Sequence, residues 1–330
     1  LKNPSSQLWK AETPLGFSSF SIAGGLASTL IGKQDEDGLQ REVCVALDIN
    51  SGREKWAVWL DRLDYGHSGG NAGTSDNNGG DGPRSTPSIS DGKVYVYDAD
   101  MNLYCLDAKS GKSIWKNSYA SSFVPGYGSA AGPRATPAID GGRVYTMGGH
   151  GVVVCTDFAT GKTVWKVDTQ KSYRASDGFF GMACSPLGER SALLLCIGGE
   201  AGGGCVALDT QTGGLLWKSL DDEASYSSPV MAKLNGKRRV VFFARTGLAV
   251  VNPANGNIDF QTRWRARIHA SVNAAAPLVA GDRIFVTSSY NTGALVLQAD
   301  GGGFNTVWSN DTSLSSQYAS VLHRDGFLYC

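Results

Sequence analysis

The sequence predicts an all-β protein, a β-propeller of four-stranded antiparallel blades. An Asp followed by a Gly four residues later and a Trp eight residues later forms a repeat, which occurs six times, complete or decayed, at intervals of 43 to 59 residues. Such a period is typical of propeller blades. Apolar residues before the Asp alternate with the two-residue period of half-buried strands, and no sustained helical stripe is present. The repeat residues are Asp48, Gly52, Trp56, Asp107, Gly111, Trp115, Asp157, Gly161, Trp165, Asp209, Gly213 and Trp217, with decayed copies at Asn252, Gly256, Phe260 and at Asp300, Trp308.

Each part of the repeat has a physical role. Asp and Gly between two apolar runs favour a tight antiparallel turn, because Gly accepts a positive φ and the Asp side chain can accept hydrogen bonds from nearby amides. The Trp then lies in the outgoing strand. A large ring at one fixed place per repeat suggests packing against the neighbouring repeat, so removing such a buried Trp should cost roughly 3–5 kcal/mol.

A second signal opens each repeat: a small polar residue or Pro before an apolar strand. The prolines Pro87, Pro137, Pro186, Pro229 and Pro277 follow one another at intervals of 43 to 50 residues, close to those of the Asp column. The two signals together predict one propeller over residues 1–330. Its blades are expected at about 17–60, 82–117, 132–168, 179–220, 226–262 and 272–310, with a partial blade at 317–330.

Both ends of the sequence resemble interrupted repeats. Leu8, Trp9 and Lys10 read as the outgoing strand of an earlier repeat, and residues 317–330 read as the opening of a later one. We therefore expect a fragment with about six and a half blades of a parent ring of seven or eight.

The amino-acid composition gives no indication of a nucleic-acid or membrane-spanning role. Thirty Lys and Arg residues balance thirty Asp and Glu residues, so charge does not indicate a nucleic-acid partner. No apolar run reaches the length of a membrane span, and no signal peptide is visible at the N-terminus. We expect a monomer without a transmembrane segment.

The seven cysteines are expected to act as small buried hydrophobes. Cys44, Cys105, Cys155 and Cys205 lie just before the Asp of different repeats, too far apart for disulfide geometry. Cys184 and Cys196 share a repeat, which leaves a disulfide between them open. There is no CxxC and no His-x-x-x-His pattern, so no metal site is predicted from them.

Propellers bind ligands where loops and inner strands converge, so the residues three positions before the proline column are candidates. These candidates are Arg84, Arg134, Tyr226 and Tyr318. The two arginines stand in twin Gly-Pro-Arg phrases and could form a fork for a carboxylate or phosphate; the alternative is that each braces its own blade.

A long loop, 61–81, adds His67 as a further candidate. Its Asp and Asn oxygens are of the kind that calcium prefers, but their spacing is not that of an EF-hand. A flexible loop without metal is the other interpretation.

The pattern Ala-x-Asp-x-x-(Ser/Thr)-Gly-x-x-x-Trp is complete at 46–56 and 207–217. It resembles the tryptophan-docking repeat of PQQ-like, or quinoprotein-type, β-propellers, and the resemblance covers nearly the whole chain. PQQ-dependent alcohol dehydrogenases carry this repeat, and so does a lipoprotein of the outer-membrane assembly machinery. The resemblance therefore implies the fold but leaves the function open.

For the enzymes, the resemblance would imply a vicinal cysteine disulfide against the cofactor, a calcium ion and an Asp base. This sequence has no adjacent cysteines, and its acids cannot be matched to the calcium or base motifs. We therefore expect a non-catalytic scaffold without cofactor, periplasmic or extracellular, that binds other proteins or a small anionic ligand. The alternative is a PQQ- and calcium-dependent alcohol or sugar dehydrogenase.

Overall fold

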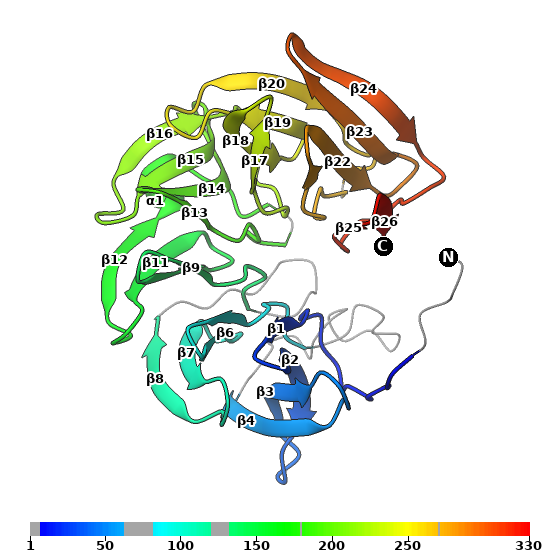
Figure 1. Ribbon diagram of the computed structural model, residues 1–330. Helices are drawn as coiled ribbons and strands as arrows, with labels where there is room; N and C mark the ends of the chain where they lie inside the picture. The colour runs from blue at the N-terminus through cyan, green and yellow to red at the C-terminus, as the bar shows by residue number, and fades with distance from the viewer. Residues whose placement is uncertain (1–6, 63–81, 120–131, 179, 270) are drawn as a thin grey trace. The chain divides into compact units, whose positions relative to one another are not determined.

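The computed structural model describes residues 7–62, 82–119, 132–178, 180–269 and 271–330. These residues form six four-stranded antiparallel sheets, a two-stranded sheet and one short helix (Figure 1). The predicted all-β class with repeated four-stranded sheets is confirmed. The helix, α1 (Thr169–Tyr173), has five residues, and no helix in the ranges above is long and apolar enough to cross a membrane.

In every four-stranded sheet, the strands follow one another in chain order. The first sheet contains β1 (Ser21–Ala23), β2 (Leu26–Gln34), β3 (Gln40–Asp48) and β4 (Glu54–Arg62), and the second contains β5 (Ser88–Ser90), β6 (Lys93–Tyr97), β7 (Asn102–Asp107) and β8 (Ser113–Ser118). The third contains β9 (Ala138–Asp140), β10 (Arg143–Met147), β11 (Val152–Asp157) and β12 (Thr163–Asp168), and the fourth contains β13 (Leu187–Glu189), β14 (Ala192–Gly199), β15 (Gly203–Asp209) and β16 (Leu215–Ser219). The fifth contains β17 (Val230–Leu234), β18 (Lys237–Phe243), β19 (Gly247–Val251) and β20 (Ile258–Arg263), and the sixth contains β21 (Leu278–Ala280), β22 (Arg283–Ser288), β23 (Gly293–Asp300) and β24 (Gly303–Asn310). The two-stranded sheet pairs β25 (Leu322–Arg324) with β26 (Phe327–Tyr329).

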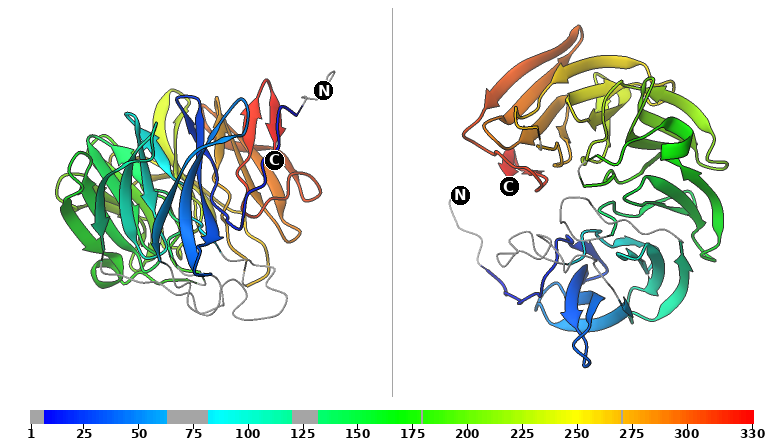
Figure 2. Two further views of the ribbon diagram at one scale, coloured as in Figure 1. Left: turned by 90° about the horizontal axis from the view of Figure 1, so that it is seen from below. Right: turned by 180° about the vertical axis from the view of Figure 1, so that it is seen from behind.

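The chain divides into two compact units. Unit 1 consists of residues 1–148 and 156–163 and contains the first two sheets. Unit 2 consists of residues 149–155 and 164–330 and contains the fourth, fifth, sixth and two-stranded sheets. The strands of the third sheet are divided between the two units. Within each unit, the long axes of the strands in neighbouring sheets are roughly aligned (Figure 2).

The up-and-down order of the strands gives each sheet two different ends. The connection between its second and third strands and the linker to the next sheet lie at one end, which we call the linker end. The Asp–Gly turn between the third and fourth strands lies at the other, the turn end. The linkers between sheets, which are the longest connections, therefore lie at the linker end, and loops of this kind carry a disproportionate share of binding residues in proteins.

The Asp of each complete repeat organises its turn through its side chain. Asp107 Oδ1 accepts hydrogen bonds from Ser110 Oγ (2.6 Å), Ser110 N (2.9 Å) and Lys109 N (3.2 Å). Gly111 N donates to the Asp107 carbonyl oxygen at 2.8 Å and has a φ of 72°. Chiefly through the Ser110 hydroxyl, these bonds hold the pKa of Asp107 below its ordinary value. The same turn recurs at Asp48, Asp157 and Asp209.

The tryptophan of each complete repeat lies against the turn of the following one. Trp56 Nε1 donates to the carbonyl oxygen of Ala108 (3.0 Å), and a Cβ added to Gly111 would lie 2.9 Å from the Trp56 ring. This pairing of an indole with a carbonyl oxygen and a glycine repeats four more times. The sets are Trp9 with Ile49 and Gly52, Trp115 with Phe158 and Gly161, Trp165 with Thr210 and Gly213, and Trp217 with Pro253 and Gly256.

The decayed copies replace this contact with another. Phe260 stands where the fifth sheet would have its Trp, and Phe304 stands where the following turn would have its Gly. The two rings stack with centroids 4.6 Å apart and an interplanar angle of 28°. Because a stacked ring pair fills the space of an indole on a glycine, the contact between these sheets is kept with different side chains.

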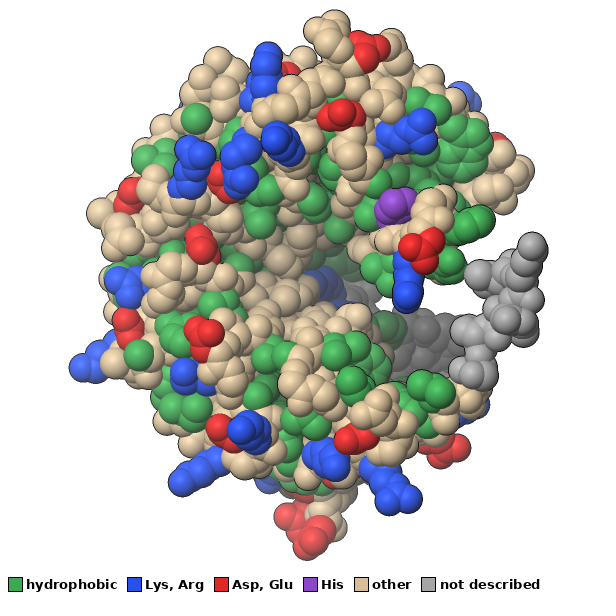
Figure 3. Space-filling view, viewed as in Figure 1, with side chains coloured by type: hydrophobic (Ala, Val, Ile, Leu, Met, Phe, Trp, Pro, Cys, Tyr) green, Lys and Arg blue, Asp and Glu red, His purple; other side chains and the backbone are tan. Residues whose placement is uncertain are grey.

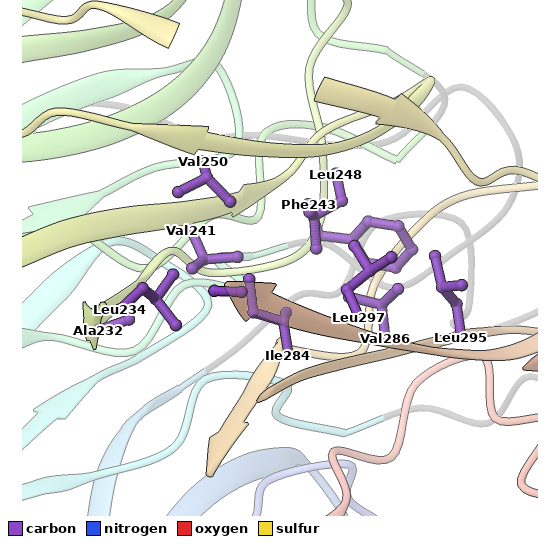
Figure 4. Packing of buried hydrophobic residues seen from close by; sticks show 11 residues of the cluster. Ala232, Leu234, Val241, Phe243, Leu248, Val250, Ile284, Val286, Leu295 and Leu297 are labelled. Atoms are coloured by element: carbon purple, nitrogen blue, oxygen red, sulfur yellow. The ribbon is translucent and has the colours of Figure 1, made fainter. Parts of the chain in front are cut away.

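Apolar side chains from facing sheets form the cores of the two units. In unit 2, Val241, Phe243 and Val250 of the fifth sheet meet Ile284 and Leu297 of the sixth (Figure 4). All five are at most 2% exposed. In unit 1 a similar cluster joins the first and second sheets. Each of these two pairs of sheets is therefore stabilised by the apolar surface buried between its members, at about 25 cal/mol per Å².

Candidate functional site

The predicted arginines lie at the linker end of unit 1, and each donates a hydrogen bond to a carbonyl oxygen of its own segment. The guanidinium of Arg84 lies over the ring of Phe17, 4.4 Å from the ring centroid, and its Nη1 donates to the Gly82 carbonyl oxygen at 3.2 Å. Phe17 occupies the same place in the first repeat as Arg84 does in the second. A cation over a ring face is attracted by the ring quadrupole, so this contact orients Arg84.

Arg134 repeats part of this arrangement one sheet later. Its Nη1 donates to the Gly132 carbonyl oxygen at 3.4 Å. The two Gly-Pro-Arg phrases lie side by side, because Ser85 Oγ donates to the Ala135 carbonyl oxygen at 2.9 Å. Both arginines are half-buried. The structure thus places the two segments together, and a shared anion site between the guanidinium groups stays a prediction.

The predicted tyrosines belong to unit 2 and have different surroundings. Tyr226 is half-buried, and its hydroxyl accepts a hydrogen bond from Phe180 N at 2.8 Å while the two rings meet edge to face, 6.0 Å apart. Tyr226 therefore fixes the linker before the fourth sheet. Tyr318 is 69% exposed in the linker before β25. His67 and nearly all of loop 61–81, with the suggested calcium ligands, lie outside the described residues.

A His–Asp pair that the sequence did not reveal lies at the linker end of unit 2. His150 Nδ1 and Asp177 Oδ2 are 3.2 Å apart, and Gln170 Nε2 donates to the other oxygen of Asp177. A carboxylate beside an imidazole supplies two of the three members of a nucleophilic triad. The thiol of the neighbouring segment, Cys184, is fully buried, and burial raises its pKa, which disfavours the reactive thiolate. Asp177 thus ties its linker to α1 through Gln170 and to the β10–β11 connection through His150.

Two acids are buried between the first and second sheets in unit 1. Asp98 is 3% exposed and accepts hydrogen bonds from Asn102 N (2.7 Å) and Asn102 Nδ2 (2.9 Å). Burial raises the pKa of Asp98 to about 6, against the opposing effect of these hydrogen bonds. Glu42 is 2% exposed and accepts a hydrogen bond from Ala99 N at 3.0 Å. Both carboxyl groups satisfy backbone donors at the β6–β7 connection.

All seven cysteines are free thiols, and only Cys330 is exposed. The disulfide left open between Cys184 and Cys196 is not formed; Cys196 N instead donates to Cys184 Sγ at 3.4 Å. Cys196 and Cys205 face each other in the register of β14 and β15. Six cysteines therefore pack as small apolar side chains.

The described residues do not bring together the ligand set that the resemblance implies for the quinoprotein enzymes. Among the described ranges, no group of three or more His, Cys, Asp or Glu side chains is placed to hold a metal ion. The complete sequence has no adjacent cysteines. The Asp residues of the repeats are engaged by their own turns, as at Asp107 and Asp209. No step through PQQ or calcium can be derived from these side chains.

Repeated four-stranded antiparallel sheets joined in series, four of them closed by an Asp–Gly turn, define a β-propeller of PQQ-like repeats. The chain belongs to the family described as outer membrane protein assembly factor BamB, whose model matches residues 40–126 and 126–330. A comparison with curated proteins finds no match.

Solved structures share the fold at low sequence identity. BamB from Moraxella catarrhalis is 17% identical, with a TM-score of 0.54, over 96% of this chain and 89% of that one. A europium-containing methanol dehydrogenase is 12% identical, with a TM-score of 0.59, over 94% of this chain and 75% of that one. The quinohemoprotein alcohol dehydrogenase from Comamonas testosteroni is 16% identical, with a TM-score of 0.56, over 87% of this chain and 53% of that one.

Proposed function

We propose that this chain is a non-catalytic propeller that binds other proteins and serves as a scaffold in the cell envelope. The observation that carries the proposal is the family match over residues 40–330, because that family is described as an assembly factor for outer membrane proteins. A factor of this kind needs surfaces for partners and no reaction centre. We propose that the protein is located in the periplasm or outside the cell.

The chemistry of the described residues supports a binding role. Arg84 is engaged by an aromatic ring and a backbone carbonyl, and Tyr226 by a linker amide. The face seen in Figure 3 carries acidic and basic side chains interspersed, in keeping with thirty of each in the sequence. A mixed surface of this kind suits protein partners better than nucleic acid.

The linker end of unit 2 offers apolar contact area. Ile268 and Tyr290 are each 51% exposed and Tyr318 is 69% exposed, and they come from three separate connections. Exposed tyrosines supply large, rigid surfaces with a polar tip, which is why they are enriched where proteins bind each other. We propose this end as the partner-binding surface.

Site-specific photocrosslinking in cells tests this proposal. A photoreactive phenylalanine replaces Tyr290 or Tyr318, and the control replaces Val164, which is 40% exposed beside the turn of the third sheet. The expected result is a recurrent crosslink to the same envelope protein from Tyr290 and Tyr318, with none from Val164. Equal crosslinking from all three positions would argue against a linker-end surface.

A second experiment addresses the dehydrogenase alternative. Purified protein is titrated with PQQ and calcium, and cofactor absorbance and dye reduction with alcohols or aldose sugars are recorded. The proposal expects neither stoichiometric cofactor uptake nor turnover. Cofactor bound at one equivalent together with substrate-dependent dye reduction would overturn it.

A further inference from the structure

Two cysteines lie directly opposite each other on neighbouring strands of the fourth sheet. Cys196 of β14 and Cys205 of β15 are Cα partners in the antiparallel register. Their side chains therefore project from the same face of the sheet, because residues directly opposite each other across a strand pair share a face. Cys196 is 2% exposed and Cys205 is 0% exposed, and both are free thiols in the structure.

The backbone hydrogen bonds identify the type of this cross-strand pair. Cys196 N donates to Cys184 Sγ at 3.4 Å, and Cys184 precedes β13, on the side of β14 away from β15. In β15, Asp209 N donates to the Gly214 carbonyl oxygen on the side of β16. Cys205 lies four residues earlier and directs its N–H to the same side, because N–H directions alternate along a strand. Both N–H groups thus point away from the partner cysteine, which makes this a non-hydrogen-bonded pair.

This geometry suits a disulfide bond. Cα atoms of a non-hydrogen-bonded pair lie about 4.5 Å apart, and a disulfide joins Cα atoms about 4.4 to 6.8 Å apart. The two thiols also interact: burial first, and then a hydrogen bond and charge at the Cys196 thiol, raise the pKa of Cys205. Cys184 is less well placed for a bond to Cys196. Its sulfur faces the N–H of Cys196 in the plane of the sheet, whereas the Cys196 side chain stands perpendicular to that plane.

We infer that Cys196 and Cys205 close a disulfide bond while the fourth sheet folds, by exchange with an external disulfide. The thiolate of one cysteine attacks the external disulfide and releases one thiol, and the thiolate of the other then attacks the mixed disulfide and releases the second thiol. The two cysteines lose two protons and two electrons, and the external disulfide is reduced to two thiols. The connection between β14 and β15 is only residues 200–202, so formation of this hairpin brings the two thiols together.

Burial determines when the bond can close. In the folded chain the two thiols have almost no accessible surface, and burial raises the pKa of Cys205, which disfavours the thiolate that exchange requires. Before β14 and β15 pack against the neighbouring sheets, an oxidant can reach both thiols. The bond therefore forms during folding and is protected afterwards. The supply of an oxidant in the cell rests on the proposed envelope location, whereas the chemistry of the pair does not.

Refolding in a glutathione buffer tests the pair in the intact chain. Protein unfolded in guanidinium and reduced with dithiothreitol is refolded with reduced and oxidised glutathione, alkylated in guanidinium and digested with trypsin without reduction. Cys196 and Cys205 lie on one tryptic peptide, 191–218, and Cys184 lies on the preceding one, 175–190. Most chains should yield peptide 191–218 without alkyl groups and lighter by two hydrogens. Protein refolded under dithiothreitol should yield the doubly alkylated peptide and unfold at a lower urea concentration than the closed form.

Cys184→Ser is the matched control, because it removes the neighbouring buried thiol and should leave the yield of closed peptide unchanged. Doubly alkylated peptide 191–218 from refolded wild type, or a cross-link between peptides 175–190 and 191–218, would overturn the pair; neither result depends on a variant that might not fold. Folded, reduced protein in the same buffer should take at least about ten times longer to close the bond than the refolding chain. Equally fast closure would overturn formation during folding. Absence of the bond would leave the proposed function standing, because the proposed partner surface does not include these thiols.

Discussion

The indole of Trp56 donates its Nε1 hydrogen to the carbonyl oxygen of Ala108, 3.0 Å away on the following sheet. The same ring covers Gly111, whose φ is 72°. Two requirements thus fall on one position: a backbone conformation that L side chains rarely adopt, and space for a ring. Separate substitutions can distinguish their contributions.

Gly111→Ala should lower the free energy of unfolding by about 3 kcal/mol, because it meets both the unfavourable φ and the Trp56 ring. Gly92→Ala is the matched control, with a φ of 71° and nothing within 4 Å of the added Cβ, and should cost about 1 kcal/mol. Urea unfolding measures both values. Equal losses for the two variants would mean that the ring contact adds nothing to the conformational cost.

The ring pair of the decayed repeats should behave as one energetic unit. Phe304→Gly alone removes a stacked partner of Phe260, and Phe260→Trp alone overfills the space, so each should destabilise the protein by about 2 kcal/mol. The double variant recreates the indole-on-glycine pair found at Trp217 and Gly256 and should be less destabilised than the two single variants added together, by at least about 1 kcal/mol. Additive effects would show that the two positions are independent.

Asp98 should give the stability of the protein a specific dependence on pH. Its folded-state pKa of about 6 lies above the ordinary value of 3.8, so the folded state holds the proton more tightly than the unfolded state. The contribution is fully present below about pH 4 and is lost as the pH rises through 6. Relative to Asp98→Asn, wild type should therefore lose on the order of 2–3 kcal/mol between pH 4 and pH 7. Parallel stability curves for the two proteins would contradict this.

The thiols should separate into one reactive and six protected groups. Cys330 is exposed, whereas the other six cysteines are buried, and burial raises the pKa of Cys105 to about 11. In native protein that has been kept reduced, Ellman's reagent should modify one thiol per chain quickly, and all seven after denaturation in guanidinium. Removing Cys330 by Cys330→Ser should abolish the fast phase. A fast phase that persists in this variant would point to opening of a sheet.

Local patterns allowed the repeated sheets to be predicted, because the turn chemistry is contained within a few residues. Asp107, Ser110 and Gly111 act on one another across one turn, so their spacing in the sequence reflects their geometry. The stacking of Phe260 on Phe304 was not foreseen, although both residues depart from the repeat. Noticing that these departures fall at matching places in successive repeats would have suggested it.

The linker-end contacts could not be predicted in the same way. His150 and Asp177 are 27 residues apart, and Arg245 and His269 are 24 apart, in connections without periodicity. Which linker side chains meet depends on how each linker folds back over its sheet.

In each of these contacts the indole precedes its carbonyl acceptor in the sequence, and this order has a consequence during synthesis of the chain. The carbonyl oxygen that accepts the hydrogen bond of Trp56 belongs to a residue 52 positions later in the chain. The carbonyl oxygen that accepts the hydrogen bond of Trp165 belongs to a residue 45 positions later. On the ribosome, each indole therefore emerges well before the turn that will cover it. Until the next repeat has been synthesised, the indole of the last complete repeat lacks the turn that covers it in the folded protein.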